Sequence, residues 1–598
     1  MEQHMKKHLI IVFILILLML MLPLAAGQHL SVKIDHPVYA ILGWAEIQGI
    51  IPHQISVKPY SASRILTLLN RIAEHKSQLN SREEAEIQAI IEDLTFNYMD
   101  FSDPAQIINQ GVYGTYNEDL NIGVALGAAF DAEATIDLTG NHLYDFRSSV
   151  RPYIKSDILD FASFYMDFGL RFDKLDNRVF LGTDFTIPGE GFYLLLTEGG
   201  ERLEEIPDPE GRGFAGLDFN PEISLSFLSG ALQFRIGNYK RNWGTGTNSL
   251  QLAGTARPFE GVEGRLELSN WLRYSFITGS LGIFSLSTLG GEAFFSDNLS
   301  NREDYRFNTN YSGKRLEVDF FKNFTFGIFE SCVWQKRFEL AYLNPFGILL
   351  FQQNLYGDLD NILAGFDFQW RFPGVVKLYA SLAATEMHEI SPSRIFVAPR
   401  NIMGMQAGAD FTLPVGLFSK ISVQYTKLDP FFYTHYTHTG VFLHPIYRDD
   451  PDAKLETAYV NKGENLGYPL HPNSDEFLIK ANIGIGSGWD SIVTFKYQRR
   501  SGQYGYAIDD PVDLGYANMD AYDDKDFLGY IFEQTLSCEI GLTKRFDNLP
   551  FTLFGSYHYW LTTNRDRVDT SEVNHIYADE WNTPVHHHSL KIGISLYR

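Results

Sequence analysis

The residues whose types and spacing best suit ligand binding lie in one stretch, residues 231–263. Apolar and polar side chains alternate along its first half, which predicts a strand in which every second residue points to the same side. The polar face would carry two guanidinium groups and two aromatic rings, those of Arg235, Tyr239, Arg241 and Trp243. Aromatic faces stack on sugar rings and arginines bind hydroxyls or carboxylates, so this track predicts a glycan-binding site. The alternative is that the arginines only pair with acidic side chains facing the same space.

Enzymatic and metal chemistry find little support in the sequence. It contains no Gly-x-Ser-x-Gly elbow and no His-Glu-x-x-His motif. His435 and His438 are three residues apart, so on a strand they would face opposite sides and could not easily share a metal. Residues 586–588 are three histidines, and we expect an exposed turn there rather than a metal clip. We therefore expect no enzyme, no cofactor and no metal, with a dispersed hydrolase triad as the alternative left open.

One long polar segment, residues 501–526, combines acidic and aromatic side chains. It holds seven aspartates and four tyrosines. Clustered carboxylates could chelate Ca²⁺ and the tyrosines could stack on sugars, but the spacing of an EF-hand is missing. We favour a solvated loop kept soluble by its charge.

The elements that must position these residues are strands. In residues 164–173, Phe164, Phe168 and Phe172 share one face while Asp167 and Asp173 share the other, which is a period of two. The same pattern recurs to the last residues without the 40 to 50-residue repeat of a propeller. If the apolar face meets lipid, the sheet must close on itself, because an open edge in hydrocarbon leaves backbone groups unpaired. We therefore predict an all-β fold, a closed antiparallel transmembrane β-barrel with polar residues inside.

An export signal is expected at the start of the chain, residues 1–27. Lys6 and Lys7 precede an apolar run over residues 9–22, followed by small residues up to Gly27. This run is short for a membrane-spanning helix, which needs about 20 residues. A secreted barrel with these features is expected in the cell outer membrane.

A different pattern separates the signal from the strands. Residues 65–72 and 87–94 have helical spacing, and Ser81 with Glu84 has the form of a capping box. We expect residues 28–110 to form a small helical head or plug at the periplasmic mouth, and residues 111–598 to form the barrel. About ten residues per strand plus loops gives about 18 strands. Long extracellular loops are expected at residues 188–220, 297–313, 437–476, 501–526 and 562–587.

Charge and cysteine content limit the possible partners. A formal net charge of −24 argues against nucleic acid as a partner. The two cysteines, Cys332 and Cys538, could form a disulfide only if their strands lie close together, and we favour two unpaired thiols. Outer-membrane lipid, lipopolysaccharide and the barrel insertion machinery are the expected partners of any such barrel.

Several motifs resemble the capsule assembly Wzi family of outer-membrane proteins. They are Trp-Gly-Thr-Gly at residues 243–246, Tyr-Leu-Asn-Pro at 342–345, Asp-Asn at 360–361 with Gly-Phe-Asp at 365–367, and Gln-Tyr-Thr at 424–426. The resemblance implies an 18-stranded barrel, a helical bundle at its periplasmic end and a lectin-like role in holding capsular polysaccharide at the cell surface. The motif residues that we single out are Gly244, Gly246, Asn248, Asn344, Pro345, Asn361 and Asp367.

Two other functions stay open at this point. A barrel of this width could be a porin or transport channel, with the resemblance reflecting architecture alone. Residues 36–71 also partly resemble a surface-layer homology module, which would give the head a role in docking to a cell-wall polymer.

Overall fold

The fold is described from a computed structural model of the whole chain. The residues that the structure describes are 29–98, 113–117, 122–139, 144–158, 161–175, 192–196, 212–281, 309–335, 339–356, 360–434, 438–439, 454–455, 457–461, 464–501, 527–528, 532–546, 551–565 and 584–597. The expected signal (residues 1–27) and most of the acidic segment 501–526 lie outside them.

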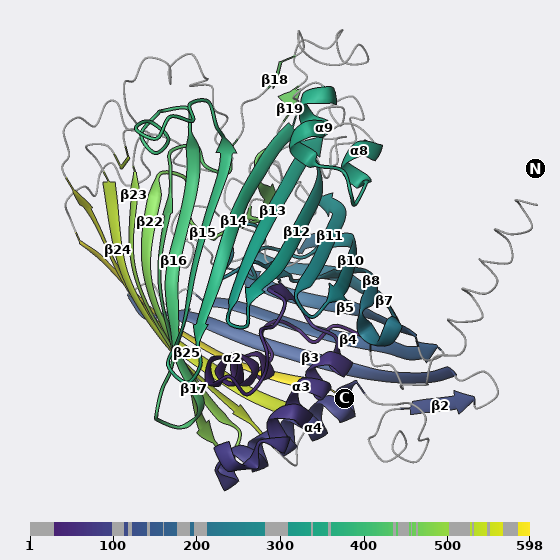
Figure 1. Cartoon of the computed structure of the whole chain (residues 1–598). Helices are drawn as coiled ribbons and strands as arrows, with labels where there is room; N and C mark the ends of the chain where they lie inside the picture. The colour runs from purple at the N-terminus through teal and green to yellow at the C-terminus, as the bar shows by residue number, and fades with distance from the viewer. Residues whose placement is uncertain are drawn as a thin grey trace, which may run out of the picture.

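Among the described residues, eighteen antiparallel strands close into a barrel (Figure 1). Closure comes from β26 pairing with β3, where Tyr597 lies opposite Ala129. The predicted all-β barrel is confirmed. Its strands are β3 (Ile122–Asp137), β4 (Tyr144–Ile158), β5 (Ala162–Leu175), β7 (Arg212–Phe227), β8 (Leu232–Tyr239), β10 (Phe259–Ser269), β11 (Leu272–Leu281), β12 (Thr309–Phe321), β13 (Phe324–Gln335), β14 (Asp360–Phe372), β15 (Val376–Glu386), β16 (Ile402–Thr412), β17 (Leu417–Leu428), β22 (Ser474–Gly486), β23 (Trp489–Ser501), β24 (Phe532–Arg545), β25 (Phe551–Arg565) and β26 (Val585–Tyr597), with the short β2 (Tyr113–Asn117) and β6 (Phe192–Leu196) paired to β3 and β7.

The two faces of the wall follow the alternation of the sequence. In β5, Phe168 and Phe172 are 44% and 49% exposed, whereas Asp167 and Asp173 are 6% and 0% exposed. In this strand, apolar side chains therefore face outward and charged side chains face the lumen, which is the usual pattern of outer-membrane barrels. This barrel places the chain in the cell outer membrane. None of the described helices is both long and apolar enough to cross a membrane.

The strand connections are short at one end of the barrel and long at the other. Residues 270–271, 322–323 and 373–375 are tight connections, while 240–258 and 429–473 are long. The short-turn end of such barrels is periplasmic. The helical head and the C-terminus lie at this end (Figure 1).

The described residues of the head form three α-helices, one short strand and a single 3-10 turn, η1 (Lys76–Gln78). The α-helices and the strand are α2 (Val38–Gln48), β1 (Val57–Lys58), α3 (Ala62–Glu74) and α4 (Ser81–Asn97). The capping box of α4 is formed by Asn80 and Glu83, not by Ser81 and Glu84, because Ser81 is already the first helical residue. The helical faces expected from the spacing are buried, including Ile65, Leu69 and Leu94.

Parts of the expected loops belong to strands or to the lumen. Residues 212–220 lie in β7, 309–313 in β12, and 562–565 in β25. Residues 474–476 begin β22, and Tyr459 and Leu466 are fully buried, so the expectation of a long extracellular loop over residues 437–476 is partly wrong. The three histidines lie inside β26 rather than in a turn before it, so His587 faces the side opposite to His586 and His588.

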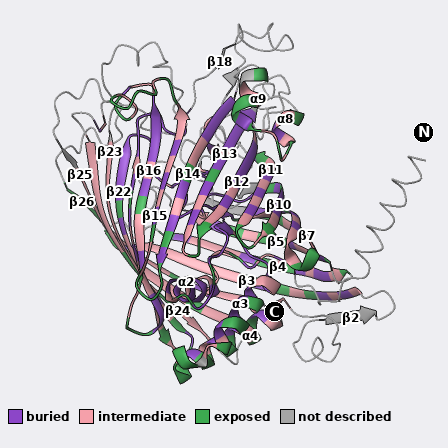
Figure 2. Cartoon of the chain, viewed as in Figure 1, coloured by how far each residue is buried: buried purple, intermediate pink, exposed green. Residues whose placement is uncertain are grey.

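Figure 2 shows buried residues in α2 and along β12 and β13. Apolar packing occurs on both sides of the wall. A large core fills part of the lumen and joins the head, the inward connections and the wall. A small separate core includes Cys332 and Trp334 of β13. No disulfide bond joins Cys332 of β13 to Cys538 of β24, as expected.

Candidate functional site: the filled lumen

The stretch singled out by its side chains turns into the lumen after β8. Residues 240–258 link β8 to β10 and carry the short strand β9 (Asn242–Trp243), which pairs with β1 of the head. Trp243 lies opposite Val57 and is fully buried. The backbone N–H of Gly244 also donates to the carbonyl of Ser56 at 3.1 Å. This connection, which we call the first inward segment, therefore joins the barrel wall to the head.

A buried carboxylate, that of Glu263 on β10, gathers the arginines of this region. Its oxygens lie 3.5 Å from Arg235, 3.2 Å from Arg241 and 2.8 Å from Arg265. All four side chains are at most 5% exposed. Register explains the cluster, because Glu263 lies directly opposite Arg235 across the β8–β10 pair and both face the lumen. This geometry matches the alternative expectation, in which the arginines pair with acidic side chains that face the lumen.

Other donors of the two arginines bond to main-chain carbonyls and to the side-chain oxygen of Gln233. Arg235 donates to the carbonyl of Pro59 in the head at 2.7 Å. Arg241 donates to the carbonyls of Gly237 and Phe259 at 2.9 Å, and its guanidinium lies 4.0 Å from the centre of the Tyr239 ring. The predicted track is thus assembled in one place, but the head and the first inward segment cover it.

Gly246 lets the first inward segment approach the opposite wall. Gly246 has a φ of 81°, and a Cβ there would lie 2.6 Å from the side-chain oxygen of Gln424 on β17. The same oxygen accepts the backbone N–H of Thr247 at 3.0 Å. Gln406 of β16 donates to the carbonyl of Asn248 at 2.8 Å. The motif residues Gly246 and Asn248 therefore hold this segment across the lumen.

A second inward segment comes from the connection between β17 and β22 and consists of its described residues 429–434, 457–461 and 464–473. Tyr433 donates to the carbonyl of Leu250 at 2.7 Å, and Tyr459 donates to the carbonyl of Gln251 at 2.6 Å. The two tyrosine rings stack, with centroids 5.3 Å apart and an interplanar angle of 11°. The backbone N–H of Ala253 also donates to the carbonyl of Leu466 at 2.7 Å. Direct hydrogen bonds therefore connect the second inward segment to the first.

The head is fixed to the wall by ion pairs. Glu46 of α2 lies 3.4 Å from Lys377 of β15, which also lies 3.4 Å from Asp410, and His53 Nδ1 lies 2.7 Å from the other Glu46 oxygen. Burial by itself raises the pKa of Glu46, but Lys377, His53 and Arg371 outweigh it and hold this pKa well below its usual range. Glu46 is therefore a buried anion that holds α2 against the wall through its ion pair with Lys377.

A second contact between the head and the wall involves Ser56, in the head segment before β1. Its backbone N–H donates to Glu317 of β12 at 3.1 Å. Arg315 lies 2.7 Å from both Glu317 and Asp367. The motif residue Asp367 is thus part of a buried network that ends on the head, and Asn361 donates to the carbonyl of Tyr433 at 3.3 Å.

The wall formed by β22–β26 and β3–β4 is more open than the side that holds the head. Its lumen face carries half-buried ion pairs, including Lys591 with Glu133 at 2.7 Å and Arg147 with Glu133 at 4.0 Å. Lys496 lies 3.4 Å from Glu476 on the same side. Within the part of the chain that the structure describes, the filling therefore packs mainly against the side that holds the head, and charged groups line the side formed by β22–β26 and β3–β4.

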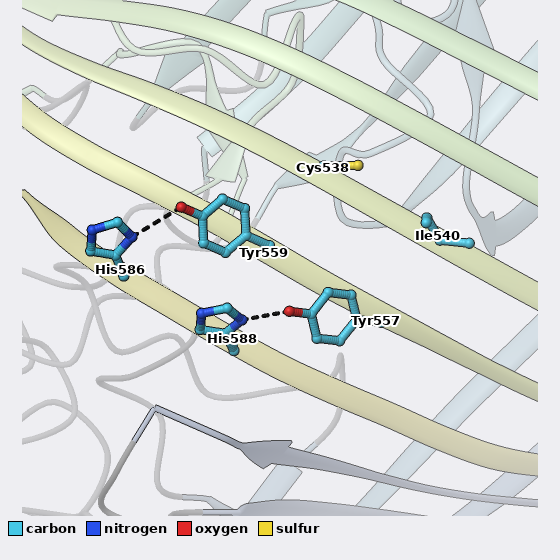
Figure 3. A pocket seen from close by; sticks show the side chains of 6 residues that line it. All are labelled: Cys538, Ile540, Tyr557, Tyr559, His586 and His588. Carbon is cyan, nitrogen blue, oxygen red and sulfur yellow. Dashed lines mark hydrogen bonds between the residues drawn. The ribbon is translucent and has the colours of Figure 1, made fainter.

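A shallow crevice lies on the outward face of β24–β26. It has a volume of about 500 Å³ and is lined by Cys538, Ile540, Tyr557, Tyr559, His586 and His588 (Figure 3). Each tyrosine hydroxyl meets one imidazole: Tyr557 lies 2.5 Å from His588 Nδ1, and Tyr559 lies 2.9 Å from His586 Nδ1. Among the described residues, no group of three or more histidine, cysteine, aspartate or glutamate side chains could hold a metal ion.

The predicted site residues divide into two groups. Arg235, Tyr239, Arg241, Trp243, Gly244, Gly246, Asn248, Asn361 and Asp367 lie in or against the lumen filling. Asn344 and Pro345 lie elsewhere, on the outer side of the wall. Sequence reasoning missed Glu263, Glu317 and Tyr459. Alternation could have placed Glu263 on the lumen face, but nothing local indicates its three partners.

Comparison with known proteins identifies the fold. No family model and no curated protein matches the sequence. The structure is similar to Wzi of Escherichia coli, described as an outer-membrane protein involved in group 1 capsule assembly and a carbohydrate-binding β-barrel, with a TM-score of 0.50, 14% identity, and coverage of 96% of this chain and 99% of that chain. Weaker likenesses include Pseudomonas aeruginosa OprD (TM-score 0.38, 8% identity, 79% and 95% coverage) and a BenF-like porin from Pseudomonas fluorescens (0.36, 11%, 81% and 100%). Membership of the Wzi family stays a prediction, since this level of identity identifies a fold alone.

Proposed function

We propose that this outer-membrane barrel binds a surface polysaccharide without converting it and helps to attach or assemble a capsule-like layer. The observation that carries the proposal is the filled lumen, in which the head and two inward segments hydrogen bond to one another and to the wall. Such a lumen favours a binding surface at the extracellular end over an open passage. The fold of a carbohydrate-binding barrel, shared over nearly the whole chain, supports the same class of function.

The test is the ratio of cell-bound to shed polysaccharide in a deletion strain, its parent and a complemented strain, with total polymer quantified in each. More shedding at unchanged total polymer, reversed by the complementing chain, is the expected result. An unchanged ratio would contradict the attachment role.

The direct glycan contacts expected for Arg235, Tyr239, Arg241 and Trp243 stay a prediction. The burial of Arg235, Arg241 and Trp243 favours an indirect role, in which they hold the first inward segment beneath the binding surface. Arg241→Ala and Trp243→Ala separate the two roles when glycan binding and thermal unfolding are measured on the same samples. Loss of binding with unchanged unfolding supports direct contact, whereas loss of both supports the indirect role.

A porin is the second candidate. The half-buried charged side chains on the β22–β26 side favour it, because a hydrated strip beside the filling could conduct ions. Single-channel recording decides between the two. A large, steady conductance of the intact protein supports the porin, and a closed protein supports the binding function.

A further inference from the structure

The connection between β13 and β14 packs on the outer side of the barrel wall. Residues 339–356 form α8 (Leu340–Leu343) and α9 (Leu349–Tyr356), and α9 contacts β13 and β14 (Figure 1). We call these residues the outer-wall cap. It buries two side chains that point away from the lumen, Cys332 at 0% and Ile362 at 5% exposed. Their uncovered neighbours in the same outward rows, Ile328 and Phe366, are 52% and 43% exposed.

The wall beneath the cap carries two opposite charges on its outward face. Lys314 of β12 and Glu330 of β13 are directly paired across the strands, 3.9 Å apart. The cap supplies their remaining partners from its main chain: Lys314 donates to the carbonyl of Gly347, and the N–H of Leu349 donates to Glu330 at 3.0 Å. Charges on a lipid-facing position are costly, so these two mark a place on the wall that is built to be covered.

The outward surface of the cap is apolar. Residues 340–356 contain no charged residue, in contrast to the aspartate-rich segment 501–526. Six large side chains of the cap are between 45% and 77% exposed: Leu340, Phe346, Ile348, Leu350, Phe351 and Leu355. α9 also contains Gln352, Gln353 and Asn354, but this many exposed large apolar side chains is typical of a surface that contacts a non-aqueous environment.

The motif residues Asn344 and Pro345 shape the turn that presents this surface. Asn344 Oδ1 accepts the backbone N–H of Phe346 at 3.0 Å, and Tyr274 of β11 donates to the carbonyl of Pro345. The Tyr274 and Phe346 rings stack with centroids 6.0 Å apart and an interplanar angle of 18°. Phe346 is nevertheless 75% exposed, so the turn holds its ring against the wall with one side outward.

We infer that the outer-wall cap is a membrane-contact site whose exposed apolar side chains lie among the acyl chains of the outer leaflet. The exposed apolar side chains of the cap continue the exposed apolar band of the wall, which includes Ile328 and Phe366. Acyl chains surround that band, so they are also the expected neighbours of the cap. The cap thus covers the charged pair Lys314 and Glu330 of the wall and presents apolar side chains in its place. This inference concerns the outer surface and does not depend on what the lumen binds.

The test uses site-directed spin labels on the full chain in phospholipid vesicles. Phe351→Cys and Leu355→Cys are made singly in a chain in which Cys332 and Cys538 are replaced by alanine, and Thr67→Cys on the exposed side of α3 is the water-exposed control. Oxygen concentrates in hydrocarbon, whereas a nickel chelate stays in water. We expect labels at 351 and 355 to collide several-fold more with oxygen than with nickel, and the label at 67 to show the reverse.

Two results would overturn the inference. Nickel collisions dominating at both cap positions would make the cap a water-exposed loop, and dipolar broadening between labels on neighbouring molecules would make it an interface between two copies. Heat-modifiable migration in gels confirms that each variant has a folded barrel. If Cys332→Ala loosens the cap, Cys332→Val in the same background restores the buried volume and the comparison is repeated.

Discussion

At the scale of single residues, buried carboxylates decide how the lumen is filled. Glu263 is the shared partner of three arginines, one of which also binds the head through Pro59. Removing one partner of a buried ionic cluster leaves charges uncompensated, which costs about 3–5 kcal/mol. Exposed pairs contribute about 0–1 kcal/mol.

We predict that Glu263→Gln strongly destabilises the protein. The matched control is Glu267→Gln on the same strand. Glu267 pairs with Arg64, and the side chains of Glu267 and Arg64 are 29% and 22% exposed. Thermal unfolding in detergent should show a loss of about 3 kcal/mol for the first variant and at most about 1 kcal/mol for the second. Equal losses would mean that the arginine cluster is not what stabilises this region.

The second inward segment should respond to acid. Burial lowers the pKa of His471 well below its usual value, and Arg500 lowers it further. In the released segment the imidazole regains an ordinary pKa of about 6.5, so the released state binds more protons as the pH falls. The stability of the docked segment is therefore complete above about pH 6.5 and declines below it, by at most about 1.4 kcal/mol per pH unit.

Hydrogen exchange of residues 464–473, corrected for intrinsic rates, checks this prediction between about pH 8 and about pH 5. We expect faster exchange on the acidic side in the wild type and a flatter profile in His471→Asn. A profile that is identical in both proteins would contradict a role for this histidine.

At the scale of elements, strand alternation predicted which side chains of β8 face the lumen, and Arg235 is buried there. The pattern could not predict the partners of these side chains, because pairing register depends on strands that are distant in sequence. It also missed the second inward segment: Tyr433 and Tyr459 lie in a polar connection, and their burial depends on carbonyls near Leu250. The head helices were predictable because their apolar spacing is local.

Gly246 offers a test of how closely the first inward segment must approach the wall. Gly246→Ala adds a methyl group 2.6 Å from the Gln424 oxygen in addition to the strain of a positive φ. Gly230→Ala, in the turn before β8, has a comparable φ of 89°, but the nearest atom would be 3.7 Å away. We expect Gly246→Ala to lose about 1–3 kcal/mol more than Gly230→Ala in thermal unfolding, and to become cleavable by protease within residues 240–258. Comparable losses would assign the cost to backbone strain alone.

At the scale of the whole molecule, ion pairs hold the head against the wall, and we expect the head to act as a lid. Glu46→Ala leaves Lys377 and His53 without their shared carboxylate, which should weaken head docking by about 3–5 kcal/mol. In planar bilayers we expect a closed wild type and intermittent openings of the variant. Glu92→Ala, on an exposed position of α4, should stay closed. A Glu46→Ala protein as closed as the wild type would show that the inward segments alone block the lumen.

The docking of the head also has a consequence for biogenesis. Gln48 of α2 donates to Thr412 at the end of β16, a hydrogen bond between residues 364 positions apart in the chain. Contacts of such separation form late, after the intervening chain has been ordered. The head is made first, but its site does not exist until most of the wall is in place. We therefore expect the helices of the head to remain undocked in the periplasm while the barrel forms, and to dock onto the wall last.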